Sequence, residues 1–208
     1  MKHTKTYILD RALKLFNKKG FVNVRLQHIA DFGDISVGHL AYHFRTKETL
    51  LEALYDQLKT QQEKVLYEFR MAHLLEDIDG QLRAIFHCQQ QYVFFYLDTL
   101  ELLRGSSDIA EKHRKYMDWQ LQQIEWMFLF NVDCNTFLPP SKENQYQHLA
   151  WMFWLTIDNW MYARQIRGMD HLDEERFTAD LWLLLTPYLT PAALEDLQLM
   201  TLNSGINM

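Results

Sequence analysis

Hydrogen-bond donors gather in one short segment, SVGHLAYHF, where His39, Tyr42 and His43 stand close together. Imidazole and phenol groups donate to phosphate oxygens and to the edges of bases. Val37 adds apolar surface of the kind that contacts thymine methyl groups. Lys47 follows at the start of the next helical pattern, where a cation and free backbone amides together favour a phosphate. These residue types at this spacing indicate contact with DNA.

Two short helical patterns, over 26–32 and 37–43, position these side chains on either side of a tight turn. Ser36 precedes the second pattern, where its oxygen is placed to accept from free backbone amides as an N-cap. Leu40 and Phe44 lie four residues apart, so both face the core. The layout predicts a helix-turn-helix, whose second helix lies in the major groove.

The first quarter of the chain carries a specific order of serine, glycine, leucine, aromatic, phenylalanine and lysine at fixed spacing. On this order the chain resembles the TetR-like family of one-component transcription regulators. The resemblance implies that Gln27 reaches a base from the preceding helix and that Arg25, Tyr42, His43 and Lys47 contact phosphates. The matching residues are Ile8, Ala12, Leu15, Phe16, Gly20, Phe21, Ile29, Ala30, Ser36, Gly38, Leu40, Tyr42, Phe44, Lys47, Glu48 and Leu51.

Three positions differ from the family pattern. Asp34 replaces a glycine usual in the turn, and Arg25 replaces the threonine or serine usual at the start of the first short helix of the motif. Ala41 replaces the first of two aromatic residues usual on the recognition helix. The differences concern individual DNA contacts and leave the expected fold unchanged.

Charge is distributed unevenly along the 208 residues, whose net charge is −6. Residues 1–50 carry nine Lys/Arg and four Asp/Glu, a net +5, whereas the remainder carries twelve and twenty-three, a net −11. A basic N-terminal segment can meet phosphates while the acidic remainder faces away.

The chain is expected to be all-α, because glycine and proline are scarce (seven and four) and no hairpin signal occurs. We expect a DNA-binding domain over 1–47 and a regulatory and dimerisation domain over 48–208, joined by the long helix that starts near Lys47. Nine or ten helices are expected, over 4–18, 26–32, 37–43, 47–72, 81–103, 109–130, 143–167, 173–187 and from Pro191, with a loop at 131–142.

Aromatic residues crowd the segment 81–103, and polar side chains lie among them. Pockets between helices are lined in this way, so the segment is a candidate site for a small hydrophobic effector. The alternative is that the aromatics close on one another as ordinary core. The candidate polar residues are His87, Gln91, Tyr92, Tyr96, Asp98 and Glu101.

Two C-terminal segments, 145–167 and 177–189, are apolar on almost every side. Such a helix must be buried against more than its own domain, which predicts a homodimer built as a four-helix bundle. The alternative is an internal core helix. The residues assigned to the interface are Phe153, Trp154, Ile157, Trp160, Met161, Leu181, Leu184 and Leu185.

Other classes of function find little support. Phosphate loops, zinc-protease motifs and nucleophile elbows do not occur, and Cys88 and Cys134 are too few for a metal cluster or a disulfide framework. We therefore expect no enzyme activity, no metal and no cofactor. The absence of an 18-residue apolar run and of a signal peptide predicts a cytoplasmic protein without membrane contact.

The sequence thus predicts a repressor released from a palindromic, double-stranded DNA operator by an apolar effector. Two alternatives stay open. One is a helical dimeric interaction module controlled by a protein partner, and the other is a helical enzyme acting on an apolar substrate. Salt-dependent DNA binding would distinguish the predicted repressor from both of these alternatives.

Overall fold

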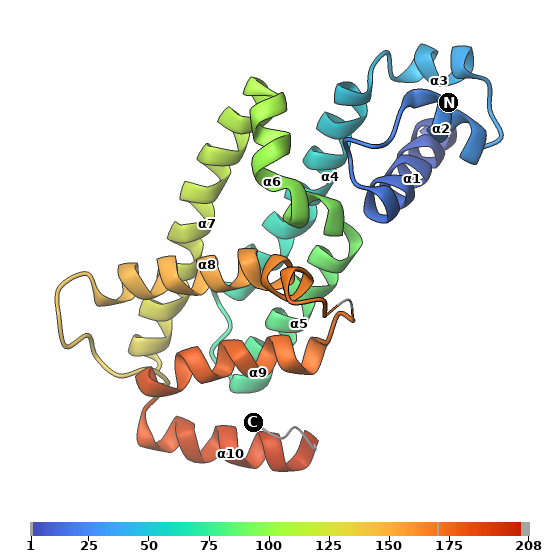
Figure 1. The fold of residues 1–208 in the computed structure, drawn as a ribbon. Helices are drawn as coiled ribbons and strands as arrows, with labels where there is room; N and C mark the ends of the chain where they lie inside the picture. The colour runs from blue at the N-terminus through green and yellow to red at the C-terminus, as the bar shows by residue number, and fades with distance from the viewer. Residues whose placement is uncertain (1, 170, 205–208) are drawn as a thin grey trace. The chain divides into compact units, whose positions relative to one another are not determined.

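The computed structural model describes residues 2–169 and 171–204, which form ten α-helices and one short 3-10 helix (Figure 1). The predicted all-α fold is confirmed. Between the described residues there is one isolated antiparallel bridge, Phe137–Leu189, and no strand. The helices are α1 (Lys2–Lys19), α2 (Leu26–Phe32), α3 (Val37–His43), α4 (Lys47–Phe69), α5 (Leu75–Gln91), α6 (Val93–Gly105), α7 (Ser107–Asp133), α8 (Gln145–Ile166), α9 (Glu174–Leu185), η1 (Thr186–Tyr188) and α10 (Pro191–Ser204).

The chain divides into two compact units. The first comprises residues 1–61 and 91–114, and the second comprises 62–90 and 115–208. Helices α4, α5 and α7 each contribute residues to both units. The expected division between a DNA-binding and a regulatory domain at residue 47 stays a prediction.

Helix α1 forms because its apolar residues recur at helical spacing. Ile8, Ala12 and Phe16 are all fully buried in the first unit. The helix ends as predicted at Gly20, whose φ of +74° is a conformation that glycine adopts without a steric penalty. Its backbone N–H donates to the Phe16 carbonyl at 2.8 Å.

The segment 81–103 is not one helix, as the sequence suggested, but the end of α5 and most of α6. The chain leaves helical geometry at Tyr92, with φ −121° and ψ 38°. Asn17, on α1, binds both sides of this break: its Nδ2 donates to the Gln91 carbonyl at 2.8 Å and its Oδ1 accepts from Phe94 N at 3.1 Å. The break is therefore capped by a side chain from a distant part of the sequence.

The second unit has an aromatic core between α7, α8 and the segment that follows α7. Phe128 lies 5.6 Å from the ring centres of both Phe137 and Phe153, and all three are fully buried. Farther along α8, Trp160 meets Phe177 of α9 edge to face at 5.3 Å. In Figure 1, α9 lies between α8 and α10.

Candidate nucleic-acid interface and ligand cavity

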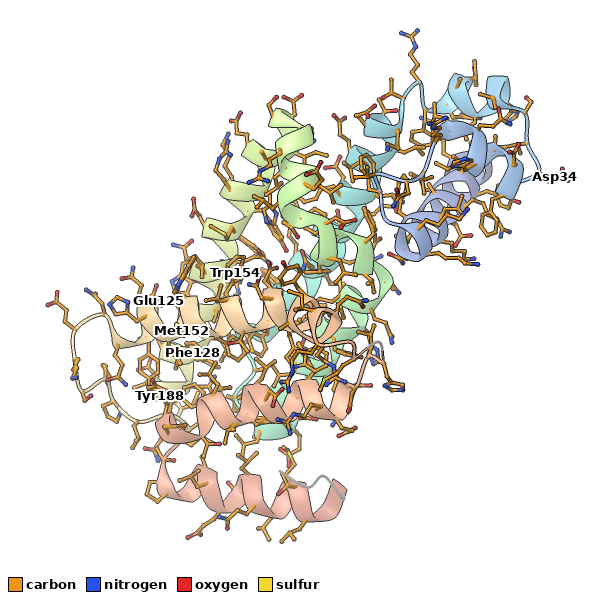
Figure 2. The ribbon with its side chains drawn as sticks, in the orientation of Figure 1. Asp34, Glu125, Phe128, Met152, Trp154 and Tyr188 are labelled. Atoms are coloured by element: carbon orange, nitrogen blue, oxygen red, sulfur yellow. The ribbon has the colours of Figure 1, made fainter. Side chains whose placement is uncertain are left out.

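The turn between α2 and α3 is held by backbone hydrogen bonds. The N–H of Ile35 donates to the Ala30 carbonyl at 3.0 Å, and that of Gly33 donates to the Ile29 carbonyl at 3.0 Å. Asp34, with φ +48°, takes the left-handed conformation, and its short polar side chain tolerates this better than most. Figure 2 shows Asp34 at the outer edge of α1–α3. The family's usual glycine therefore corresponds to a real backbone requirement that aspartate meets here.

The start of α3 is fixed as predicted. Ser36 Oγ accepts from the backbone N–H of His39 at 3.1 Å, so Ser36 is the N-cap. Leu40 is fully buried and Phe44 nearly so, which fixes the face that α3 turns inward. The opposite face is consequently presented to solvent.

The outward face of α3 carries the donor side chains. Tyr42 is 75 % exposed. His43 lies between it and His39, with ring-centre distances of 5.1 Å to Tyr42 and 5.3 Å to His39. Slight desolvation and the charges of His39 and Lys5 lower the pKa of His43, so its imidazole is neutral at neutral pH and donates through one nitrogen.

Lys47 is anchored before any DNA is present. Its Nζ donates to the Phe21 carbonyl at 3.0 Å and lies 4.1 Å from the centre of the Phe21 ring. Desolvation lowers the pKa of Lys47, opposed by the charge of Glu48. The ammonium therefore fixes the start of α4 against the segment after α1 and retains further N–H groups for a phosphate.

The other candidate DNA contacts lie on or next to α2 and α3. Gln27 Nε2 donates to Asp31 Oδ1 at 2.6 Å, which leaves its Oε1 available as an acceptor. Arg25 is exposed and precedes α2, and its backbone N–H donates to His28 Nδ1 at 3.2 Å. Val37 is half-buried at the start of α3. None of the seven side chains predicted to contact DNA is buried, and all belong to the first unit.

The six side chains predicted to line a pocket do not gather at one. Tyr92 and Tyr96 are buried in the first unit, where Gln61 Nε2 donates to the Tyr92 hydroxyl at 3.3 Å. His87 is exposed in the second unit, with Nε2 3.3 Å from a carboxylate oxygen of Glu174. Asp98 is half-buried, and the remaining two, Gln91 and Glu101, are exposed.

A cavity opens elsewhere, between helices of the second unit. It encloses about 400 Å³ of space outside the protein atoms, part of it open to solvent, and its centre has room for about one water molecule. Trp154 forms part of the wall, and its Nε1 donates to Gln120 Oε1 at 3.3 Å. Figure 2 shows Trp154 on α8 beside α7. The lining residues are Gln62, Val65, Leu66, Ile85, Cys88, Gln89, Gln120, Ile124, Trp154, Ile157 and Asp158.

Two oxygen-bearing groups of the cavity lack a partner among the described residues. Gln89 is 1 % exposed; its Nε2 donates to the Ile157 carbonyl at 3.1 Å, and its Oε1 accepts no hydrogen bond. Asp158 follows Ile157 on α8, and burial raises the pKa of its carboxyl to about 7. Burial also raises the pKa of the Cys88 thiol to about 12, so this thiol stays neutral.

These polar residues were not predicted from the sequence, although one signal was present. Asp158 is the single acidic residue of α8, and it follows the mostly apolar run from Leu149 to Ile157. An isolated carboxylate in an apolar helix is costly to bury without a partner, so it marks a candidate site.

The residues assigned to a dimer interface lie mostly inside the chain's own core. Seven of the eight are buried within a single chain, and Leu184 is half-buried. Burial inside one chain leaves little of these side chains for a partner, so their assignment to the interface stays a prediction. The same helix α8 exposes a different apolar stripe, made of Trp151, Met152, Leu155, Tyr162 and Ile166, which we call the α8 stripe.

Two kinds of site are absent from residues 2–169 and 171–204. No described helix is long and apolar enough to span a bilayer. No three His, Cys, Asp or Glu side chains there are grouped so as to hold a metal ion.

Comparison with known proteins agrees with this geometry. Residues 8–54 match the family described as bacterial regulatory proteins, tetR family, and residues 48–197 match the TetR family described as bacterial transcriptional repressor. A probable HTH-type transcriptional regulator, YttP of Bacillus subtilis (strain 168), is 41 % identical over 51 residues, which cover 24 % of this chain and 25 % of that relative's length.

Solved structures share the fold over nearly the whole chain. A TetR-family transcriptional regulator from Marinobacter aquaeolei VT8 superposes with a TM-score of 0.83 at 27 % identity, covering 99 % of each chain. A putative transcriptional regulator from Saccharomonospora viridis, solved in complex with choline, superposes with a TM-score of 0.71 at 18 % identity, covering 89 % of this chain and 97 % of that one. With a helix-turn-helix at its N-terminus and family matches that together span residues 8–197, the chain belongs to the TetR family of transcriptional regulators.

Proposed function

We propose that the protein is a repressor whose dimer binds a pseudo-palindromic operator, with one α3 helix in the major groove of each half-site. The outward face of α3 carries this proposal, because a capped helix holds Tyr42 and His39 exposed while Leu40 is fully buried. The net +5 of residues 1–50 supplies attraction to phosphates.

The α8 stripe is the surface that we propose a second copy covers. Leu155 is 37 % exposed, Trp151 43 % and Ile166 67 %, and these residues recur at i, i+4 and i+15 on one side of the helix. Large apolar side chains gathered on one face mark an interaction surface more often than isolated ones do. A symmetric pair of such helices would bury the stripe in a two-fold interface.

An effector in the cavity of the second unit is proposed to control DNA binding. Helix α4 starts at Lys47, beside the recognition helix, and its residues Gln62, Val65 and Leu66 line the cavity. A ligand that widens this narrow space would displace α4. Because the two half-sites lie about 34 Å apart, a small displacement of each recognition helix is enough to lose its match to the operator. The ligand acts only if it binds the mismatched state more tightly. That a structural relative was solved with choline supports a small-molecule effector.

The proposal is tested by selecting duplexes from random sequence with the full-length protein and measuring binding by fluorescence anisotropy over a range of salt. We expect selection of a two-fold symmetric site and an affinity that falls steeply with salt. Failure to select any duplex would instead favour the helical module controlled by a protein partner. The matched variants Tyr42→Ala, on α3, and Tyr67→Ala, at an exposed tyrosine of α4, separate a loss of DNA contact from a general effect.

A further inference from the structure

The cavity of the second unit combines in its lining the oxygen acceptors of Gln89 and Asp158 with several aliphatic side chains. We infer that it takes an organic cation: a protonated amine carrying a slender apolar chain, with its ammonium group between Asp158 and Gln89. This inference rests on the proposed effector function and specifies the ligand class of that site.

The charge of the ligand follows from Asp158. Asp158 is half-buried, none of the printed hydrogen bonds or ion pairs of the described residues involves its carboxylate, and the lining residues include no Lys, Arg or His. A carboxylate partly removed from water without a partner is unfavourable, and a cation is the partner that compensates it. An anionic ligand would add a second negative charge beside the first. The carboxylate therefore selects a positive group.

The number of donors on that group follows from Gln89. The orientation of its amide is fixed, because the Ile157 carbonyl beside it accepts and so requires the Nε2 end. Gln89 Oε1 is thus a true acceptor, and it is buried without a donor. A buried acceptor in this state calls for a donor, and Gln89 is the one such residue among those that line the cavity. An ammonium with two or more N–H groups satisfies both Gln89 and the neighbouring Asp158, which a quaternary ammonium does not.

The apolar part of the ligand follows from the remaining walls. Val65, Leu66, Ile85, Ile124 and Ile157 contribute aliphatic side chains from α4, α5, α7 and α8. The centre of the cavity is narrow, so an unbranched alkyl chain enters with the smallest displacement of these helices. Each methylene group buried there should raise the affinity about fourfold.

Hexylammonium and hexan-1-ol are suitable probes, because they share one alkyl chain and differ in charge and in the number of donors. Isothermal titration of the full-length protein at pH 8 keeps both Asp158 and the amine ionised. We expect hexylammonium to bind at least about tenfold more tightly than hexan-1-ol, as hydrogen bonds to charged groups allow. Hexyltrimethylammonium, which keeps the charge without N–H donors, should fall between them.

The variants Asp158→Asn and Gln89→Met test the two acceptors separately. Asp158→Asn should abolish the preference for hexylammonium over hexan-1-ol. Gln89→Met should abolish the preference for hexylammonium over hexyltrimethylammonium. Glu195→Gln, which removes an exposed charge from α10, is the matched control and should change neither ratio.

Equal affinity of the wild-type protein for hexylammonium and hexan-1-ol overturns the inference, and this comparison needs no variant to fold. Absence of hexylammonium binding at millimolar concentration, or an unchanged preference in Asp158→Asn, overturns it as well. Release of the selected operator is measured separately. If hexylammonium binds through Asp158 but does not release DNA, the ligand class stands and the proposed effector control fails.

Discussion

Tyr55 Oη and His113 Nδ1 lie 3.2 Å apart in the first unit, where they join α4 to α7. Both residues are buried, and the Phe95 ring lies 5.4 Å from the imidazole. Burial lowers the pKa of His113 to about 4, so the ring stays neutral and hydrogen-bonded to the phenol at neutral pH.

This pair predicts a loss of stability in mild acid. Between pH 6.5 and about 4, His113 is protonated in the unfolded chain but stays neutral in the folded protein. The free energy of unfolding therefore falls as pH falls. His113→Gln should remove up to roughly 3 kcal/mol of this decrease, measured by urea unfolding across the window. His148→Gln, at an exposed position of α8, is the control. Parallel pH profiles for wild type and His113→Gln would contradict the prediction.

For Asp158 we predict the opposite dependence of the free energy of unfolding on pH. Its native pKa of about 7 lies above the ordinary 3.8, so the folded carboxyl holds a proton where the unfolded one has lost it. This contribution to stability therefore declines as pH rises from about 4 to 7. Asp158→Asn should stabilise the ligand-free protein most at pH 8, by up to roughly 4 kcal/mol, and least at pH 4. An equal effect at both pH values would show that the carboxylate is solvated.

The same group predicts how ligand affinity depends on pH. Among the described residues that line the cavity, no group other than Asp158 titrates between pH 5 and 8. The side chains from α4, α5 and α7 are amides, aliphatic groups and the Cys88 thiol, whose pKa is about 12. Hexylammonium affinity should therefore fall about tenfold per pH unit below pH 7, while hexan-1-ol affinity stays flat. Titration calorimetry at pH 6 and 8 measures both.

Tyr42 and Lys47 should differ in what their removal does to the free protein. Tyr42→Ala should weaken operator binding without changing stability, because the side chain is 75 % exposed. Lys47→Ala should weaken binding, reduce the salt slope by about one, and also cost about 1 kcal/mol of stability through the lost bond to Phe21. Anisotropy and thermal unfolding of each variant distinguish the two. Operator affinity unchanged in both would refute the contact assignment.

Charges on α8 should have different effects on its two faces. Leu155→Glu, on the α8 stripe, should leave a folded monomer, whereas Ile157→Glu, which is 7 % exposed, should unfold the second unit by burying an unpaired charge. Light scattering and circular dichroism report the two outcomes. Leu100→Glu, at an exposed leucine of α6, is the control and should remain dimeric. A wild-type protein that is monomeric at micromolar concentration would end the dimer proposal.

Removing the Asn17 side chain should destabilise the protein more than removing a half-buried polar side chain usually does. Asn17→Ala removes two hydrogen bonds that cap the break between α5 and α6, so it should cost about 1–3 kcal/mol. Chemical unfolding measures the loss. Asn23→Ala is the comparison, because Asn23 Nδ2 makes one exposed bond, to Lys19. If the two variants lost equal stability, the hydrogen bonds of Asn17 would not stabilise the break between α5 and α6.

Local signals in the sequence determined the helix-turn-helix almost completely. The bounds of α2 and α3, the cap at Ser36 and the burial of Leu40 all agree with prediction. Each depends on groups within a few residues of one another: a side chain that accepts from the next turn, or an apolar spacing of four. Such short-range interactions are present in the sequence itself.

Tertiary structure alone decided three other features. The break at Tyr92 lacks a glycine or proline and is capped by Asn17, 74 residues from Gln91. The inward face of α8 was not predictable, because apolar residues occupy nearly every side and only packing buries Ile157 and exposes Leu155. The cavity near Asp158 depends on which side chains from four helices fail to fill the space between them. Packing is a property of the assembled helices, so periodicity in one segment cannot specify it.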